Sequence, residues 1–499
     1  MSSSYGLAAV GLVAVTTLLI GAFGLRLSRT TSDFYVASRA VSPLWNASAI
    51  GGEYLSAASF LGIAGLILVH GADMLWLPVG WTGGYLILLV LVSAPLRRSG
   101  AYTLPDFAEA RLESMRVRHA ASVLVVLIGW LYLMPQFQSA GLVLHTLTGA
   151  PVWAGGLLVA VVIAVNVLSG GMRSITFVQA FQYWVKLTAL AVPIVFLLLA
   201  WRTDGAPRIT DRQWLLPLEG SRAHPIYATY SLILATFLGT MGLPHVLVRF
   251  YTNPDGRTAR RTTLVVLSLL GAFYLLPALY GALGRLYAPD LIATGHSDAV
   301  VLALPARMVG GTAGNLLGAL VMGGAFAAFL STSSGLTVSV AGVLAQDILH
   351  GGVRSFRAAT LLAVTVPLLL ATAARALPVA DVVGLAFAVA ASTFCPVLVL
   401  GVWWRRLTDA GTLAGLFAGG GLACAAVAGT IVIGPLGGWP GALLAQPAAW
   451  TVPVAFGVMV TVSLLTPGRV PAGVARTMVR LHAPEVLDLD RGDWRPRKA

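Results

Sequence analysis

The chain consists largely of apolar stretches that are each long enough to cross a lipid bilayer. Short polar segments, which contain most of the arginines, separate these stretches along the 499 residues. About 20 apolar residues span the hydrocarbon core as a helix, which satisfies its own backbone hydrogen bonds. The pattern predicts an all-α polytopic membrane protein with about 13 transmembrane helices. They are expected near residues 5–25, 44–69, 75–96, 117–146, 151–168, 176–201, 226–248, 263–288, 314–346, 358–375, 379–404, 412–434 and 449–466.

Composition supports a membrane protein over a nucleic-acid binder. Hydrophobic residues make up 57% of the chain and charged residues only 10%, whereas soluble domains have roughly 25% charged residues. The formal net charge of +13 comes from arginines in short loops, with no basic patch interleaved with aromatics. We therefore expect membrane lipid, and not nucleic acid, around this chain. Cys395 and Cys424 lie inside apolar runs without metal or redox spacing, which predicts buried thiols.

The distribution of arginine and lysine among alternate loops predicts the orientation of the chain. One set of loops, together with the C-terminal tail, holds about 24 of these residues and the opposite set about 7, and the richer set normally faces the cytoplasm. The first apolar run, Tyr5–Leu25, lacks a basic leader and a small-residue cleavage site, so we expect it to be retained. These features predict a plasma-membrane protein, of bacterial inner-membrane type, with its N-terminus outside and its C-terminus in the cytoplasm.

Two of the expected helices are interrupted by glycine or proline at corresponding positions. The second helix contains Gly51 and Gly52, and the seventh contains Gly239, Gly242 and Pro244. In transporters built from inverted repeats, unwound backbone near the midplane provides dipoles for ions and substrate. The separation of five helices predicts a five-plus-five inverted repeat, although close helix packing also explains a glycine pair.

This repeat predicts four parts of the chain. They are an N-terminal extra helix with a cytoplasmic loop (1–43), a first inverted repeat of helices 2–6 (44–202), a second inverted repeat of helices 7–11 (203–411), and two C-terminal helices with a basic cytoplasmic tail (412–499).

Several motifs occur in a fixed order along the chain. They are Asp33–Ala37, Tyr54–Gly62, Gly170–Ser174, Gly239–His245, Ala386–Arg406 and Arg480–Glu485. As a set they resemble the sodium:solute symporter family, and the first, second, fourth and last resemble its cation/acetate branch. Asn166 departs from the family pattern, which usually has an aromatic or aliphatic residue there. The resemblance implies a leucine-transporter-type fold with extra flanking helices and the symport of a small monocarboxylate.

The resemblance also implies a sodium site at the interruption of the second helix. Na⁺ binds several oxygen ligands, which hydroxyls and free carbonyls supply, and the ninth helix carries hydroxyls at Ser331–Ser334. The alternative is that these hydroxyls bond only their own helix backbone. Apart from Na⁺ as coupling ion, no cofactor is expected. The implied Na⁺ ligands are Gly52, Leu55, Ala328, Ser331 and Thr332.

Two ionisable residues, Glu53 and Lys186, fall at mid-depth in expected helices. An unpaired charge there is unfavourable and usually marks function or pairing. Either the two side chains pair with each other, or one carries a proton if protons drive transport. The remaining alternatives are a structural ion pair and a position beside an aqueous cavity.

Substrate contacts are expected near the two interrupted helices, because free amides at helix ends suit a carboxylate. His245 follows the interruption of the seventh helix, where it either gates, binds the carboxylate, titrates or only packs. Gln136 is a further polar residue on a core helix. The substrate and gate candidates are Gly51, Tyr54, Gln138, Thr240, Gly242, His245 and Ser392.

These observations predict a secondary active symporter that imports acetate or a similar short-chain monocarboxylate with Na⁺ by alternating access. One alternative is proton-coupled symport of a monocarboxylate or another small solute. The other is a membrane sensor that uses a transporter fold without transporting. An enzyme is not expected, because no acid, base and nucleophile cluster in the sequence. The oligomeric state is not predicted.

Overall fold

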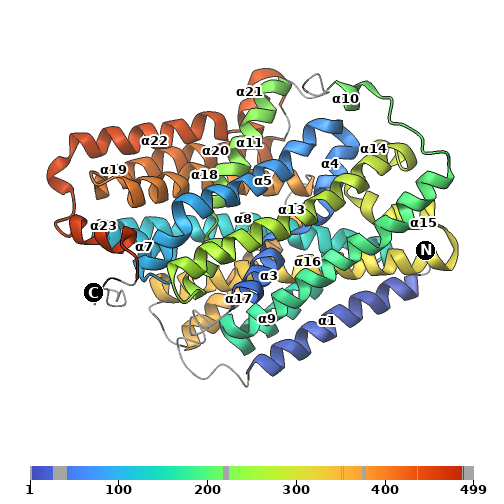
Figure 1. Cartoon of the computed structure of the whole chain (residues 1–499), viewed down its shortest axis with the longest axis horizontal. Coiled ribbons are helices and arrows are strands. Elements are labelled where there is room, and N and C mark those ends of the chain that lie inside the picture. The colour runs from blue at the N-terminus through green and yellow to red at the C-terminus, as the bar shows by residue number, and fades with distance from the viewer. Residues whose placement is uncertain are drawn as a thin grey trace.

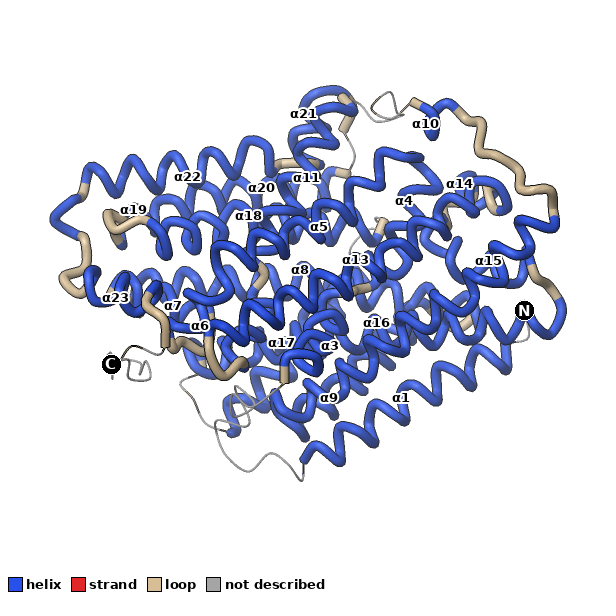
Figure 2. Tube along the Cα trace, viewed as in Figure 1, coloured by secondary structure: helices blue, strands red, loops and turns tan. Residues whose placement is uncertain are grey.

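The described part of the chain is an all-helical bundle. The computed structural model describes residues 3–25, 42–216, 218, 224–349, 351, 353–373, 378–434, 436–485 and 487. Figure 1 shows α1 along one edge of the bundle and α19, α20 and α22 along the opposite edge. Within these residues every regular element is a helix, as Figure 2 shows. The predicted fold class is thereby confirmed.

The α-helices of at least five residues are bounded as follows. They are α1 (Ser3–Leu25), α3 (Pro43–Tyr54), α4 (Ile63–His70), α5 (Trp76–Ile87), α6 (Ser93–Ser99), α7 (Leu104–Leu112), α8 (Met115–Thr148), α9 (Val152–Thr203), α11 (Pro225–Gly242), α12 (Pro244–Val248), α13 (Gly256–Tyr287), α15 (Val300–Met308), α16 (Gly311–Val343), α17 (Val353–Ala373), α18 (Val379–Trp403), α19 (Asp409–Gly415), α20 (Gly421–Ile433), α21 (Gly438–Ala445), α22 (Ala448–Leu465) and α23 (Val474–His482). The short helices α10 (Arg212–Leu215) and α14 (Asp290–Ala293) lie in loops.

The number of membrane-spanning helices agrees with the prediction. Among the described residues, 11 stretches are long and apolar enough to cross a membrane, and Val152–Leu168 is a shorter apolar one. The stretch Ala58–Ser99 contains two predicted helices, because the chain turns between α4 and α5 at Gly71, whose φ is 74°. Glycine adopts this left-handed conformation without a steric penalty. Together these segments account for the predicted set of about 13.

Both predicted helix interruptions are present. Helix α3 ends at Tyr54, and helical structure resumes in the turn Ala58–Gly62; Leu55 between them has a non-helical ψ of 85°. Helix α11 ends at Gly242, and α12 begins at Pro244 after an extended Leu243. Proline disfavours helical geometry in the residue before it, which explains the second interruption.

Glycines next to these interruptions also let helices approach closely. A Cβ atom at Gly52 would lie 2.2 Å from the carbonyl oxygen of Gln179 on α9. A Cβ atom at Gly239 would lie 2.4 Å from the carbonyl oxygen of Phe387 on α18. Close packing of helices and interruption of a helix were alternative explanations for these glycines. In the structure both occur at the same places.

One predicted helix boundary differs in the structure. The runs expected at 151–168 and 176–201 belong to one helical element, α9, which continues through Gly170 and Gly171. Glycine lowers helix propensity by about 1 kcal/mol relative to alanine but does not end a helix by itself. The side chains of residues 169–173 and the whole Asp33–Ala37 motif lie outside the described residues.

Candidate cation and substrate site

The interruption after α3 directs backbone carbonyl oxygens toward α16. Carbonyls in the last turn of a helix have no partner within that helix. The Ser331 hydroxyl lies 2.5 Å from the Gly52 carbonyl oxygen and 3.2 Å from that of Ala328. Thr332 donates a hydrogen bond of 2.7 Å to the Glu53 carbonyl. Together with the Leu55 carbonyl, these groups form a cluster of buried oxygens that we call the oxygen cage.

The oxygen cage holds the ammonium group of Lys186. This side chain comes from α9, is fully buried, and donates to the Leu55 carbonyl at 2.7 Å and to the Ser331 hydroxyl at 2.8 Å. Its third hydrogen bond goes to the Gly52 carbonyl. An ammonium group has three donors, and all three are used here. A side-chain cation therefore binds three of the residues that were expected to bind Na⁺.

Glu53 pairs with Arg249 and not with Lys186. The Arg249 Nε atom lies 2.8 Å from Glu53 Oε2, and the two side chains are only 1% and 2% exposed. Arg249 also donates to the Thr176 hydroxyl at 2.7 Å and to the Gln179 side-chain oxygen. A direct pair of Glu53 and Lys186, which was one of the alternatives drawn from the sequence, is therefore not what the structure contains. The sequence did not identify Arg249 as this partner, because its place at the end of a helix suggested a charge in a loop. The position of Glu53 at mid-depth did indicate that it needs a cationic partner.

Gln179 connects the ion pair to the oxygen cage. Its side-chain nitrogen donates a 2.8 Å hydrogen bond to the Ser331 carbonyl, while its oxygen accepts from Arg249. Because Ser331 contacts Lys186 through its hydroxyl, one short path of hydrogen bonds joins Lys186 to Arg249. This path links α9 and α16 with the segment that follows α12.

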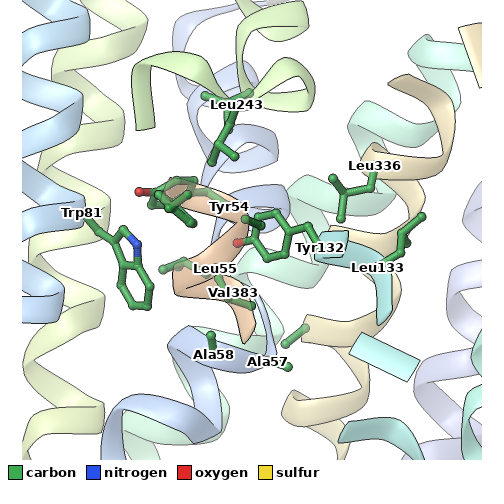
Figure 3. Packing of buried hydrophobic residues seen from close by; sticks show 14 of the residues in the cluster. Tyr54, Leu55, Ala57, Ala58, Trp81, Tyr132, Leu133, Leu243, Leu336 and Val383 are labelled. Atoms are coloured by element: carbon green, nitrogen blue, oxygen red, sulfur yellow. The ribbon is translucent and has the colours of Figure 1, made fainter. Parts of the chain in front are cut away.

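Aromatic and polar side chains surround the interruption on its other side. Tyr54 and Thr240 share a hydrogen bond of 2.8 Å, and the ring of His245 lies 5.3 Å from that of Tyr132. Both ring nitrogens of His245 are buried without a hydrogen-bond partner among the described residues. Figure 3 shows Tyr54, Leu55 and Tyr132 grouped at the interruption. Three sequence candidates, Tyr54, Thr240 and His245, thus come from different helices into this region.

The other candidates contact neighbouring helices. A Cβ atom at Gly51 would lie 2.8 Å from the Tyr183 ring, and one at Gly242 would lie 2.3 Å from the Ala390 carbonyl oxygen. Ser392 bonds Thr451 of α22 at 2.7 Å. We interpret these contacts as packing.

The two glutamines of α8 also face different surroundings. Gln138 donates to the Ala371 carbonyl of α17 at 3.1 Å. Gln136, by contrast, accepts a 3.0 Å hydrogen bond from the Ala57 amide. It is therefore Gln136 that lies at the interruption.

Interrupted helices in two related positions, an oxygen cage between α3 and α16, and a bundle of membrane-spanning helices define a secondary transporter of the leucine-transporter type. The chain belongs to the sodium:solute symporter family, whose model matches residues 34–419. It is therefore a multi-pass membrane protein and a solute symporter, and not an enzyme.

Two curated relatives extend over most of the chain. An uncharacterized symporter, YwcA, of Bacillus subtilis is 33% identical over 432 residues, which is 83% of each protein. A monocarboxylic acid transporter of Corynebacterium glutamicum is 31% identical over 439 residues and covers 79% of this chain and 78% of its own length.

Two solved structures share the fold at low sequence identity. A Na⁺-coupled sialic acid symporter has a TM-score of 0.67 at 13% identity and covers 93% of this chain and 98% of its own. Mhp1, a nucleobase-cation-symport-1 family transporter, has a TM-score of 0.58 at 14% identity, with coverages of 91% and 99%. These similarities support the predicted fold and do not bear on substrate or coupling ion.

Proposed function

We propose that the chain imports acetate or a similar short-chain monocarboxylate together with a cation, by alternating access across the plasma membrane. The observation that carries this proposal is the oxygen cage, because it lies directly beside the aromatic groups at the interruption: Leu55 follows Tyr54 in the chain. A cation and an anion bound at neighbouring positions stabilise each other. The C. glutamicum relative, named a monocarboxylic acid transporter, supports a carboxylate as the anion.

The position of Lys186 favours the proton as the coupling ion. Its ammonium group uses oxygens of Gly52, Leu55 and Ser331 that a Na⁺ ion would need. In this form of the mechanism, protonated Lys186 holds α9 against α3 and α16, and release of the proton weakens that contact. A conformational change is driven only if the two states bind the ion differently.

Na⁺-coupled symport is the second candidate. The Ser331 and Thr332 hydroxyls lie within hydrogen-bond distance of the Gly52 and Glu53 carbonyls of the interrupted helix, so oxygen atoms that suit Na⁺ are close together. The family membership also favours it. For Na⁺ to bind there, Lys186 has to leave the oxygen cage.

Uptake by purified protein in liposomes separates the two forms. Labelled acetate is added under an imposed proton gradient, under a Na⁺ gradient, or under neither. Uptake driven by the proton gradient in Na⁺-free buffer supports proton coupling, and uptake that needs the Na⁺ gradient supports Na⁺ coupling. If no gradient drives uptake of acetate, propionate, pyruvate or lactate, the proposal is rejected and the membrane-sensor reading is revived.

Variants of the oxygen cage provide a second comparison. Under proton coupling, Lys186→Met abolishes gradient-driven uptake, while Ser331→Ala retains proton-driven uptake that is independent of Na⁺. Under Na⁺ coupling, Ser331→Ala and Thr332→Ala raise the Na⁺ concentration needed for half-maximal uptake about tenfold or more, since each removes an ion ligand.

A further inference from the structure

Two buried hydrogen-bond donors on α5 have no partner among the described residues. They are the indole nitrogen of Trp81 and the hydroxyl of Tyr85, on side chains that are 1% and 0% exposed. Most buried polar groups in proteins are hydrogen-bonded, and an unmade bond is unfavourable. The two residues are four positions apart on a helix, so they lie on the same face. Two unsatisfied hydrogen-bond donors on one face of α5 need an acceptor, and none of the described side chains provides one.

The packing of α5 fixes the backbone of these two residues beside the interruption after α3. A Cβ atom at Gly80 would lie 2.0 Å from the Thr236 hydroxyl oxygen, and one at Gly84 would lie 2.5 Å from the Thr240 Cβ atom. These close approaches hold α5 against α11, and Thr240 is also the partner of Tyr54. Rotation of α5 about its axis would therefore produce clashes.

Aromatic contacts place both residues around Tyr54. The Tyr85 ring lies 4.8 Å from the Tyr54 ring at an interplanar angle of 89°. Trp81 lies 5.7 Å from Phe387, which in turn lies 6.2 Å from Tyr54. Figure 3 shows the indole of Trp81 directed toward Leu55 and Tyr54. The rings that carry the donors thus lie beside Tyr54, at the same interruption whose carbonyls form the oxygen cage.

The chemistry of these groups selects a carboxylate. An indole N–H only donates, a phenol donates readily, and an ionised carboxylate only accepts, through two oxygens. Hydrogen bonds to a charged acceptor are stronger than those to a neutral one. The small buried side chains of Ala57 and Ala58 suit a short apolar chain attached to that carboxylate.

We infer that Trp81 and Tyr85 donate hydrogen bonds to the carboxylate of the transported monocarboxylate and thereby determine specificity for an anion of this class. The inference rests on the proposed function, since it assigns groups to the substrate that the function requires. It adds two residues of α5 to the candidates on α3, α11 and α12.

Conservative variants test the inference. Trp81→Phe and Tyr85→Phe keep an aromatic ring and remove the donor. Each is expected to raise the KM for acetate about tenfold, the effect of losing a hydrogen bond to a charged group, with little change in the maximal rate of uptake. Each also reduces the rise in Tm that acetate causes in detergent, because ligand stabilisation follows affinity. Without acetate the Tm does not fall, because the lost donor had no partner.

Tyr280→Phe is the matched control. Its hydroxyl is buried and donates a 3.2 Å hydrogen bond to the Leu190 carbonyl on α9. This variant is expected to lower the Tm without acetate and to leave the KM unchanged. An unchanged KM in both Trp81→Phe and Tyr85→Phe would overturn the inference, and would mean that water satisfies these donors. Wild-type protein that takes up none of acetate, propionate, pyruvate and lactate would instead reject the proposed function, so the two failures are distinguishable.

Discussion

At the scale of single residues, the pair of Glu53 and Arg249 is the most sensitive feature, because both charges are buried. Removing one partner leaves the other without compensation, which typically destabilises a protein by about 3–5 kcal/mol. We expect Glu53→Gln to lower the free energy of unfolding by about this amount, as measured by denaturant unfolding in detergent. Adding Arg249→Met should recover part of the loss, because it removes the uncompensated charge. A double variant as unstable as the sum of both single variants would contradict this.

Asp298 predicts a pH dependence of stability. It lies in the short helical turn Ser297–Ala299, outside the membrane-spanning stretches, and accepts a 3.2 Å hydrogen bond from the Val379 amide. Burial raises the pKa of this carboxyl from 3.8 to about 6, and nearby Asp381 adds to the rise. A raised pKa means that the folded state binds the proton more tightly. This contribution therefore favours folding most below about pH 4 and declines as the pH rises to about 6.

The variant Asp298→Asn, which cannot ionise, isolates this effect. Relative to the variant, the wild type is expected to lose about 2–3 kcal/mol of stability between pH 4 and pH 7, which is the energy equivalent of the shift in pKa. Unfolding of both proteins at several pH values, in one detergent, measures the difference. A difference in stability that does not change with pH would show that the carboxyl ionises as it does in the unfolded chain.

The sequence was informative about residue type and less so about residue partners. The resemblance implied that the Ser331 and Thr332 hydroxyls lie near the carbonyls of Gly52 and Leu55. Ser331 contacts the Gly52 carbonyl, whereas Thr332 contacts the carbonyl of Glu53, which was not among the implied ligands. The partner of Glu53 is 196 positions away, however, and which cation reaches it depends on how several helices are rotated. Trp81 and Tyr85 were not predicted, because aromatic residues in an apolar helix look alike whether they face lipid or a binding site.

At the scale of helices, close backbone contacts at the interruptions fix how neighbouring helices pack within each repeat. A Cβ atom at Gly239 would meet the Phe387 backbone, so Gly239→Ala has to move α11 away from α18. We expect this to lower the stability by about 1–3 kcal/mol and to reduce uptake. Gly271→Ala on α13 is the control, because its Cβ atom would meet nothing within 4 Å. Thermal unfolding should show no loss for the control, since alanine favours a helix more than glycine does; an equal loss in both variants would show that the contact with Phe387 is not responsible.

Helix existence was predictable, whereas helix rotation was not. The length of each apolar stretch and the positions of glycine and proline are local properties of the sequence. They therefore predicted nearly all the helices and both helix interruptions. The rotation of a membrane helix is harder to predict, since lipid-facing and core-facing sides are both apolar. Gln138 was therefore chosen over Gln136 as the residue facing the site. Two residues two positions apart point to nearly opposite sides of a helix, and Gln136 is the one at the interruption.

At the scale of the whole molecule, the first and last described helices, α1 and α23, lie on different sides of the bundle, as Figure 1 shows. The helices beyond residue 419, where the family match ends, are α20, α21, α22 and α23. Of these, α22 contacts the core directly, through the hydrogen bond between Thr451 and Ser392. The C-terminal part therefore packs as one body with the repeats.

The orientation of this body in the membrane is the remaining prediction, and single cysteines can test it. Thr294 and Ala472 are exposed positions in loops that the arginine asymmetry assigns to the outside and the cytoplasm, respectively. In a background where Cys395 and Cys424 are replaced by alanine, an impermeant maleimide should label Thr294→Cys in intact cells. Ala472→Cys should be labelled only after the membrane is opened, because the reagent cannot cross the bilayer. The reverse labelling pattern would place the arginine-rich loops outside and contradict the predicted topology.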